Sequence, residues 1–447
     1  MGTLLGEVMA EKSIIQIGMI GFGNVGQGVY RLLEKNRSLI EAKVGAQMRI
    51  KKIVVRDLAK QREVSVPEGM LTTNFDDVVS DPEIDVVLEL MGGYEPARTY
   101  LLDAMRRGKQ IVTANKAVLS VHWDEIIQTA RDHKVDIYFE AAVCGGIPVI
   151  QAINDGLAAN NITSIYGIVN GTTNFILQKM TEEKKSFKEA LQMAQKKGLA
   201  EADPTLDING MDAAHKLAIL ASLAFSKRVK VEDIYVEGID RITVQDIEFA
   251  KEEFGRVVKL FAIAEVEGDE LEVRVHPTLI PEDHLLAKVD GEYNGVLVTG
   301  DFVGTTMYYG LGAGSKPTAS AVMSDLIYVG RSVHDNVAGE ISNCWFLNDN
   351  PQIKRLKKMG DIKSRYYLKF TVLDQVGVLS AISRILGENQ ISIASVIQKE
   401  QKKGDKVPVV IVTYEALEKN VQEALKKING LPFVQEETLL IRMDRGE

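Results

Sequence analysis

The segment 194–216 brings together residue types that can bind an amino group and move a proton. Asp212 and Lys216 are four residues apart, so a helix would place them on one face. The turn signals Asp203-Pro204 and Asn209-Gly210 precede this helix, which Asn209 can cap. Several carboxylates beside one lysine suit recognition of an ammonium group and proton transfer. A capped surface helix with an ordinary ion pair explains the same pattern, and both interpretations stay open.

A second chemical motif is the glycine-rich turn Gly21-Phe22-Gly23-Asn24-Val25-Gly26. It follows the apolar run 13–20 and opens a helical pattern, which is the context that a dinucleotide-binding turn requires. Its glycines permit the tight turn and let the backbone approach a pyrophosphate. The turn therefore predicts a dinucleotide site, although a glycine turn needed only for packing remains the alternative.

The residues after the second apolar run bear on which dinucleotide binds. Arg56 comes first and Asp57 follows it. A guanidinium suits a 2′-phosphate, whereas a carboxylate would accept the ribose 2′-hydroxyl. The order favours NADP(H) over NAD(H), with Arg56 as a surface residue and Asp57 on the ribose as the alternative.

Three blocks of elements must position these residues. Strand-like runs alternate with helical stretches up to residue 150, which predicts a parallel doubly wound sheet. The expected strands are 13–20, 48–55, 85–90, 110–114 and 136–142, and the expected helices are 95–107 and 121–133.

The middle block predicts an α+β domain. Its expected strands are 162–169, 256–267, 271–280, 296–299 and 303–308, with helices at 186–197 and 211–225 and a further helix at 318–329. The charged stretch 352–365 is typical of a linker.

The last block predicts a βαββαβ unit of ferredoxin-like type. Its elements are expected at 366–373, 378–388, 392–398, 408–414, 421–427 and 434–441.

Length and composition agree with this division. A chain of 447 residues is expected to form about three domains. The net charge of −9, without a basic block, argues against nucleic-acid or anionic-membrane partners. No apolar run reaches the length of a membrane span, and the start lacks a secretory pattern. Two cysteines, Cys144 and Cys344, are too few for a disulfide framework, which predicts a reducing, cytoplasmic location.

The acidic–lysine segment resembles the signature of homoserine dehydrogenases in its Gly-Leu, Asp-Pro, Asp, Gly, Asp and Lys positions. Further matches are 18–26, 112–116, 140–143, 167–174 and 312–318. The resemblance covers residues 13–345, and the tail resembles an ACT domain. It implies domains at 1–150 with about 318–345 (cofactor), 151–317 (catalysis and dimerisation), 346–364 (linker) and 365–447 (ACT).

The resemblance implies NAD(P)H-dependent reduction of aspartate semialdehyde to homoserine. Lys216 would be the acid/base, directly or through water, and Lys116 would be a second catalytic lysine that polarises the carbonyl. Glu201 and Asp212 would bind the substrate, with Asp207 a weaker candidate. The cofactor would meet Gly21, Phe22, Gly23, Asn24, Val25, Gly26, Arg56, Lys116, Gly198 and Gly314.

The resemblance also implies a structural sodium ion. Its ligands would be Glu140 and the backbone carbonyls of Val143, Gly145 and Ile147, a hard oxygen set. A glycine-rich turn into the Pro148 helix is the simpler alternative. Cys144 stands where small residues are usual in the family, and an inert buried thiol is expected there.

The ACT-like tail is expected to have a regulatory role. The turn Asp374–Gly377 and the loop Asn389–Ser392 resemble the ligand-binding parts of ACT domains, so threonine is the expected effector and a homodimer or homotetramer the expected assembly. A tail that only assembles oligomers is the alternative.

Two other functions remain in view. A phosphorylating aspartate-semialdehyde dehydrogenase would use Cys144 as nucleophile, and a non-catalytic amino-acid sensor would need neither lysine.

Overall fold

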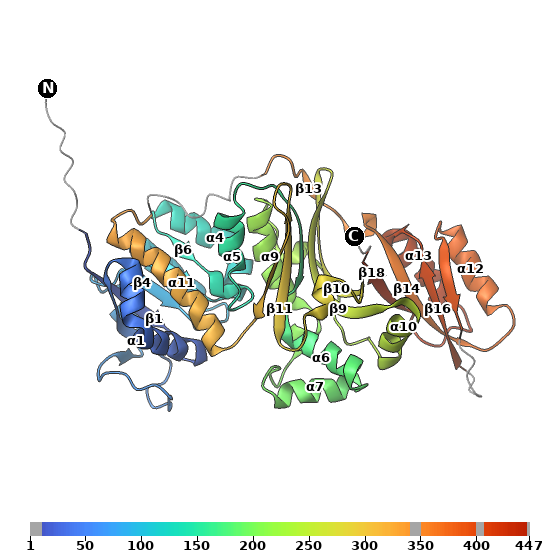
Figure 1. The fold of residues 1–447 in the computed structure, drawn as a ribbon, viewed down its shortest axis with the longest axis horizontal. Coiled ribbons are helices and arrows are strands. Elements are labelled where there is room, and N and C mark those ends of the chain that lie inside the picture. The colour runs from blue at the N-terminus through green and yellow to red at the C-terminus, as the bar shows by residue number, and fades with distance from the viewer. Residues whose placement is uncertain (1–10, 340–349, 399–405, 445–447) are drawn as a thin grey trace, which may run out of the picture. The chain divides into compact units, whose positions relative to one another are not determined.

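A computed structural model describes residues 11–339, 350–398 and 406–444. The chain divides into two compact units, with residues 1–160, 218–231 and 310–349 in unit 1 and the others in unit 2. Figure 1 shows their elements. Cys344, and the parts of the expected cofactor domain and linker between 340 and 349, lie outside the described residues.

Unit 1 is built on a six-stranded parallel sheet in the order β3-β2-β1-β4-β5-β6, which is the doubly wound order that the sequence predicts. The strand order reverses between β1 and β4, which pair in parallel, and sheets of this kind bind ligands beyond the carboxyl ends of the strands at that point. The strands are β1 (Ile14–Ile20), β2 (Gln47–Val54), β3 (Leu71–Thr72), β4 (Val86–Glu89), β5 (Gln110–Thr113) and β6 (Ile137–Tyr138).

Helices cover this sheet, and α1 packs directly on α11. An added Cβ at Gly28 of α1 would lie 2.8 Å from the Ser315 carbonyl oxygen of α11, so only glycine permits this approach. The helices of unit 1 are α1 (Asn24–Val44), α2 (Asp76–Val79), α3 (Ala97–Arg106), α4 (Lys116–Asp132), α5 (Val149–Gln151) and α11 (Ser315–His334).

Two expected elements of unit 1 have different limits. The strand expected at 136–142 ends at Tyr138, because Glu140–Ala142 forms a 3₁₀ turn instead. The helix expected at 121–133 begins at Lys116, because the Asn115 side chain accepts a hydrogen bond from the Val118 amide and caps it.

Unit 2 is built on one large mixed sheet whose main path is β12-β11-β7-β9-β10-β18-β14-β16-β15. The part of it that precedes the tail, expected from the sequence to be the catalytic part, contains β7 (Ile162–Ile168), β8 (Tyr235–Val236), β9 (Arg256–Glu267), β10 (Glu270–Pro281), β11 (Tyr293–Gly300) and β12 (Gly304–Leu311). The helices are α6 (Gly171–Glu182), α7 (Phe187–Lys196), α8 (Thr205–Ile208) and α10 (Val244–Phe254), with the first half of α9 (Met211–Ala224), whose residues from Ala218 on belong to unit 1.

The sequence prediction missed α6 and α10, both of which begin at a polar cap. Asn170 accepts from the Thr173 amide at the start of α6. Thr243 and Asp246 form a reciprocal capping box at the start of α10. Both capping residues are visible in the sequence, but the helices were missed because the hydrophobic periodicity of the residues that follow each cap is weak.

The tail forms the predicted βαββαβ unit. Its elements are β14 (Lys363–Leu373), α12 (Val378–Glu388), β15 (Ile393–Ile397), β16 (Lys406–Thr413), β17 (Ala416–Leu417), α13 (Glu418–Asn429) and β18 (Leu439–Met443). The last strand starts five residues later than expected, while Val434 forms only an isolated bridge with Val372. Strand β18 also pairs in parallel with β10, so the tail sheet continues the catalytic sheet.

The charged stretch expected to be a linker is partly ordered into this sheet. Strand β13 (Arg355–Leu356) pairs in parallel with Glu270–Leu271 of β10. Ile353 and Ile362 on either side of it are buried. The domain limits given above stay predictions.

Within the described ranges 11–339, 350–398 and 406–444, no helix has both the length and the apolar character needed to span a membrane.

Candidate active site

The acidic–lysine segment folds into a compact polar cluster inside unit 2. The Lys216 Nζ lies 2.7 Å from Asp212 Oδ2, and both side chains are almost wholly buried. Lys216 also donates to the Val169 carbonyl at 2.7 Å, at the carboxyl end of β7. The expected i, i+4 pair is therefore present, and its burial shows that it is not a surface ion pair.

Asn170 joins the remaining carboxylate to this pair. Its Nδ2 donates to Asp207 Oδ1 at 2.7 Å and to Asp212 Oδ2 at 2.8 Å. Burial raises the pKa of Asp207, while the hydrogen bond from Asn170 acts in the opposite direction. The sequence analysis quoted Asn170 within a motif but assigned it no role.

Asn294 is a second residue that the sequence analysis missed. Its Nδ2 donates to the same Val169 carbonyl at 3.1 Å. Its Oδ1 is buried and accepts no hydrogen bond from any described residue. A buried amide oxygen without a donor is unfavourable, and it fits a site that a polar ligand completes.

Glu201 and Gly198 lie in the turn between α7 and α8. Glu201 is exposed, and its carboxylate makes no hydrogen bond or ion pair with the described residues. Gly198 has φ +77°, and an added Cβ would meet nothing within 4 Å. The structure thus joins Asp207, Asp212 and Lys216 through Asn170, and it does not join Glu201 to them.

The glycine turn in unit 1 has the shape of a phosphate cradle. Gly21 has φ +99°, and an added Cβ there would lie 2.7 Å from the Leu90 carbonyl oxygen. At Gly26 it would lie 2.4 Å from the Gly21 carbonyl oxygen. At Gly23 an added Cβ would meet nothing within 4 Å, so the space beside this glycine is open. Gly21 and Gly26 form the turn, and Gly23 leaves it open.

Two helix N-termini meet beside this turn. The Ser315 Oγ, at the first turn of α11, donates to the Asn24 carbonyl of α1 at 2.6 Å. Gly314 has φ +111° and immediately precedes α11, and its added Cβ would meet only Pro317 at 3.5 Å. Both helix dipoles present their positive ends here, which favours an anionic ligand.

The two residues that bear on the choice between NADP(H) and NAD(H) follow β2. Arg56 and Asp57 are both exposed. The Asp57 carboxylate accepts from the Ala59 amide at 2.8 Å, so one of its oxygens is already used by a local turn.

Lys116 stands at the carboxyl edge of the same sheet. It is the first residue of α4, directly after the Asn115 cap. Asn115 is held in turn by donating to the Gly93 carbonyl at 2.8 Å. Nearby, the fully buried Glu89 accepts from Thr113 Oγ1 at 2.6 Å and from the Met91 amide at 2.8 Å, and burial raises its pKa.

The expected ion loop follows β6. Glu140 is buried and its carboxylate accepts from the Ile150 and Gln151 amides at 2.9 and 2.7 Å. Burial raises the pKa of Glu140 to about 7. The carbonyls of Val143 and Gly145 accept no hydrogen bond from the described residues. The Ile147 carbonyl accepts from the Val149 amide at 2.8 Å.

Two buried carboxyl groups lie at this loop. The Glu140 amide donates to Asp325 Oδ2 at 2.9 Å, and Asp325 is itself fully buried. Burial and the Glu140 charge raise the pKa of Asp325 well above its usual range. Carboxyl and carbonyl oxygens are hard donors, the kind that suits a monovalent cation. Cys144, between those carbonyls, is fully buried at φ +55°.

Comparison with known proteins identifies the family. Family models match for the homoserine dehydrogenase NAD-binding domain (residues 21–140), homoserine dehydrogenase (148–327) and the ACT domain (366–433). The homoserine dehydrogenase of Bacillus subtilis is 44% identical, over 94% of this chain and 96% of its own length. The chain belongs to the homoserine dehydrogenase family.

Other homoserine dehydrogenases are similar to this chain over nearly its whole length. The Helicobacter pylori homoserine dehydrogenase is 43% identical over 97% of this chain and its full length. The crystal structure of the Thiobacillus denitrificans homoserine dehydrogenase superposes with a TM-score of 0.91 at 43% identity, covering 98% and 99% of the two chains.

Membership in this family decides between the functions considered above. Homoserine dehydrogenases are NAD(P)-dependent oxidoreductases that act on a CH–OH group, and an ACT domain completes the chain. The resemblance inferred from sequence is confirmed, together with the predicted Rossmann-type cofactor domain, the catalytic domain of mixed helices and strands, and the ferredoxin-like ACT domain. The phosphorylating and non-catalytic alternatives are wrong.

Proposed function

We propose that Lys216 is the acid/base of homoserine oxidation and of the reverse reduction of aspartate semialdehyde. The observation that carries the proposal is its 2.7 Å contact with Asp212 inside a nearly buried cluster. A bound nicotinamide supplies the hydride to the aldehyde carbon. Lys216 gives its proton to the oxygen in reduction and takes it back in oxidation, directly or through water.

The surrounding residues bind and orient the substrate. Asp212, with Asp207 and Glu201, provides carboxylates for the substrate ammonium group, because an ammonium is bound most strongly by ionised acceptors. Asn170 holds Asp207 and Asp212 in position through its two donated hydrogen bonds. Lys116 is the second catalytic lysine of the proposal and polarises the substrate carbonyl. The unsatisfied Asn294 oxygen supports the presence of a polar ligand at this cluster.

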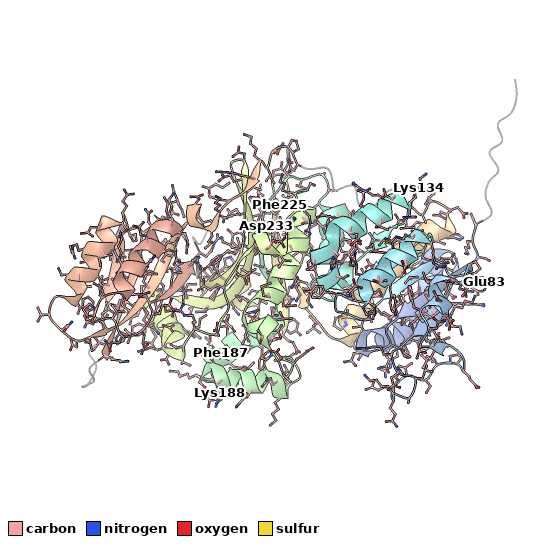
Figure 2. All side chains as sticks on the ribbon, turned by 180° about the vertical axis from the view of Figure 1, so that it is seen from behind. Glu83, Lys134, Phe187, Lys188, Phe225 and Asp233 are labelled. Carbon is pink, nitrogen blue, oxygen red and sulfur yellow. The ribbon has the colours of Figure 1, made fainter. Side chains whose placement is uncertain are left out.

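The test is NADPH oxidation with aspartate semialdehyde in the absence of phosphate. Replacing Lys216 with alanine should lower kcat by about a hundredfold to ten-thousandfold, the range typical of general acid–base catalysis. Lys188→Ala, an exposed lysine on α7, is the matched control and should retain activity (Figure 2). Full activity of Lys216→Ala, with circular dichroism unchanged, would exclude this role.

We infer that NADP(H) is preferred over NAD(H). Gly23, Asn24 and Gly314 would hold the pyrophosphate at the two helix N-termini, with Phe22, Val25 and Gly198 close to the cofactor. Arg56 is exposed at the end of β2, where a 2′-phosphate would lie, while the Asp57 carboxylate already caps a turn. Arg56→Gln should lower kcat/KM for NADPH about tenfold and leave the value for NADH unchanged, whereas Arg49→Gln should change neither. Equal effects on both cofactors would count against the inference.

We propose that Glu140 and the carbonyls of Val143, Gly145 and Ile147 hold a sodium ion. Burial disfavours the charged form of Glu140, a bound cation would offset that cost, and the loop offers hard oxygen donors. Sodium chloride should raise the melting temperature of the protein above that in choline chloride of equal ionic strength. Glu140→Gln should abolish this difference, and its persistence in that variant would rule out the site.

We propose that the ACT domain binds threonine and that the enzyme is a homodimer or homotetramer in a cytoplasmic, reducing compartment. Gly377 has φ +91° and precedes α12, and Asn389 accepts a hydrogen bond from Lys427 at 3.0 Å.

The proposed assembly is supported by the edge strand β12, which exposes Met307 and Tyr309 and so favours a second copy as partner. Calorimetric titration tests threonine, and sedimentation equilibrium tests assembly. Absence of binding, or a monomer, would contradict the respective proposal.

A further inference from the structure

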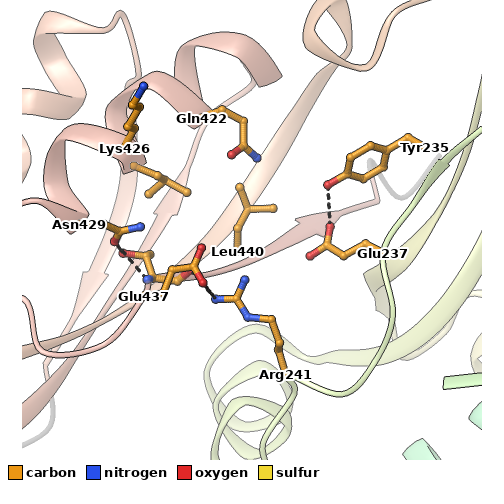
Figure 3. A pocket seen from close by; sticks show the side chains of 10 residues that line it. Tyr235, Glu237, Arg241, Gln422, Lys426, Asn429, Glu437 and Leu440 are labelled. Carbon is orange, nitrogen blue, oxygen red and sulfur yellow. Dashed lines mark hydrogen bonds and ion pairs between the residues drawn. The ribbon is translucent and has the colours of Figure 1, made fainter. Parts of the chain in front are cut away.

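A polar cavity of about 550 Å³ lies within unit 2, between the ACT domain and the catalytic part of the same chain. Tyr235, Glu237 and Arg241 line it from the catalytic side. Helix α13 and the start of β18 line it from the ACT side (Figure 3). The cavity is separate from the Asp374–Gly377 turn, which lies between β14 and α12.

The walls of this cavity carry charges of both signs. Lys426 on α13 is exposed and makes no ion pair or hydrogen bond with the described residues. Arg241 lies 3.3 Å from Glu437 and also donates to the Thr438 carbonyl at 3.3 Å. In Figure 3 the guanidinium of Arg241 points into the space from below and Lys426 stands above it.

Glu237 supplies the negative charge on the catalytic wall. One of its oxygens, Oε2, accepts from Arg442 at 2.7 Å and from the Tyr235 hydroxyl at 3.1 Å. These two donors fix the carboxylate in place. Gln422 and Asn429 add amide groups to the lining. The combination of a fixed carboxylate, two cations and two amides matches a small ligand that has one carboxylate and one ammonium group.

The catalytic wall is packed against the active-site turn. The Ile239 amide donates to the Ile208 carbonyl at 2.9 Å. An added Cβ at Gly238 would lie 2.3 Å from the same carbonyl oxygen, so the two backbones are in contact. Ile208 lies between Asp207 and Asp212 in the sequence. The segment 235–239 therefore touches the turn between the two carboxylates directly.

We propose that this cavity binds a free amino acid and that residues 235–239 transmit its occupancy to the turn between Asp207 and Asp212. The carboxylate of the ligand pairs with Lys426 and Arg241. Its ammonium group pairs with Glu237. Binding itself does not depend on the catalytic roles proposed above, so its failure and theirs are distinguishable.

Calorimetric titration of the full-length protein with each proteinogenic L-amino acid in turn tests binding. At least one should bind. Lys426→Ala and Arg241→Ala should each weaken that binding about tenfold to a hundredfold, the loss expected when a charge-assisted hydrogen bond is removed. Lys419→Ala is the matched control, because Lys419 lies on the same helix and pairs with Asp361 outside the cavity.

A second variant separates this cavity from the turn already considered. Asp374→Ala should leave the binding unchanged. The proposal is overturned if no amino acid binds, or if Asp374→Ala abolishes binding while Lys426→Ala and Arg241→Ala retain it.

Hydrogen exchange and kinetics test the transmission. The bound amino acid should slow exchange of the Ile239 amide and change KM for aspartate semialdehyde at least about twofold in the wild type. Lys426→Ala should lose both responses at the same ligand concentration. Binding without either response would overturn the coupling.

Discussion

Lys216 is placed by residues that are distant in the sequence. Asp212 comes from its own helix, whereas the Val169 carbonyl and Asn170 come from the end of β7, more than forty residues earlier. Burial makes these contacts stronger than exposed ones, because a less polar surrounding screens charge less. The cluster therefore depends on the strand end as much as on the acidic–lysine segment itself.

Asn294 offers a test at this scale. Asn294→Ala removes the unsatisfied Oδ1 that a polar ligand can satisfy, so KM for homoserine should rise about tenfold while kcat changes little. Steady-state kinetics with homoserine and NADP⁺ measures both constants. Gln192→Ala, a change at an exposed side chain on α7, serves as the control. An unchanged KM in Asn294→Ala would show that the amide does not meet the substrate.

At the scale of elements, the cofactor side depends on how closely α1 and α11 approach. Gly28 lets the first turn of α11 lie against α1, and Ser315 then bonds to Asn24. The sequence analysis placed a helix in each region but assigned no role to Gly28. The close packing at Gly28 joins α1 and α11, which are almost three hundred residues apart in the sequence.

Gly28→Ala should therefore destabilise unit 1 although alanine is the better helix former. The added Cβ would meet the Ser315 carbonyl oxygen at 2.8 Å, and overpacking of this kind costs about 1–3 kcal/mol. Gly387→Ala in α12 is the matched control, since its Cβ meets nothing and should stabilise by about 1 kcal/mol. Calorimetric melting compares the two. A higher melting temperature for Gly28→Ala would contradict the packing argument.

At the scale of unit 2, one buried arginine joins the ACT domain to the catalytic part. Arg442 on β18 is bound by Glu418 at 2.6 Å and by Glu237 at 2.7 Å. Burial would raise the pKa of Glu418, but Arg442 outweighs it and keeps that pKa low. The continuous sheet through β10 and β18 makes this network part of one core.

Arg442→Met should destabilise the protein by about 3–5 kcal/mol, because it leaves the buried Glu418 charge without its partner. The double variant Arg442→Met/Glu418→Gln should recover a large part of that loss. Urea unfolding followed by circular dichroism measures both. A double variant no more stable than the single one would exclude a charge effect.

The pH dependence of stability follows from His276 on β10. Burial, with the charges of Arg442 and Arg274, lowers its pKa well below 6.5. The unfolded chain takes up a proton below about pH 6.5 and the folded chain does not, so unfolding becomes more favourable as pH falls. The loss should approach about 1.4 kcal/mol for each pH unit below that value.

Urea unfolding of wild type and His276→Gln between about pH 5 and pH 8 isolates this contribution. The stability difference between the two proteins should be constant above about pH 6.5 and should change below it. A constant difference over the whole range would show that His276 is not the group that titrates.

The sequence by itself determined most of the elements, although not α6 and α10, and the chemical types at the site, and tertiary structure decided which of them meet. Local signals are enough for the glycine turn, the Asp212–Lys216 spacing and the βαββαβ tail, since each depends on neighbours a few residues away. The roles of Asn170 and Asn294, the Gly28 contact and the addition of β18 to β10 depend on long-range packing. Burial of a polar group depends on the whole fold, and no spacing within one segment specifies it.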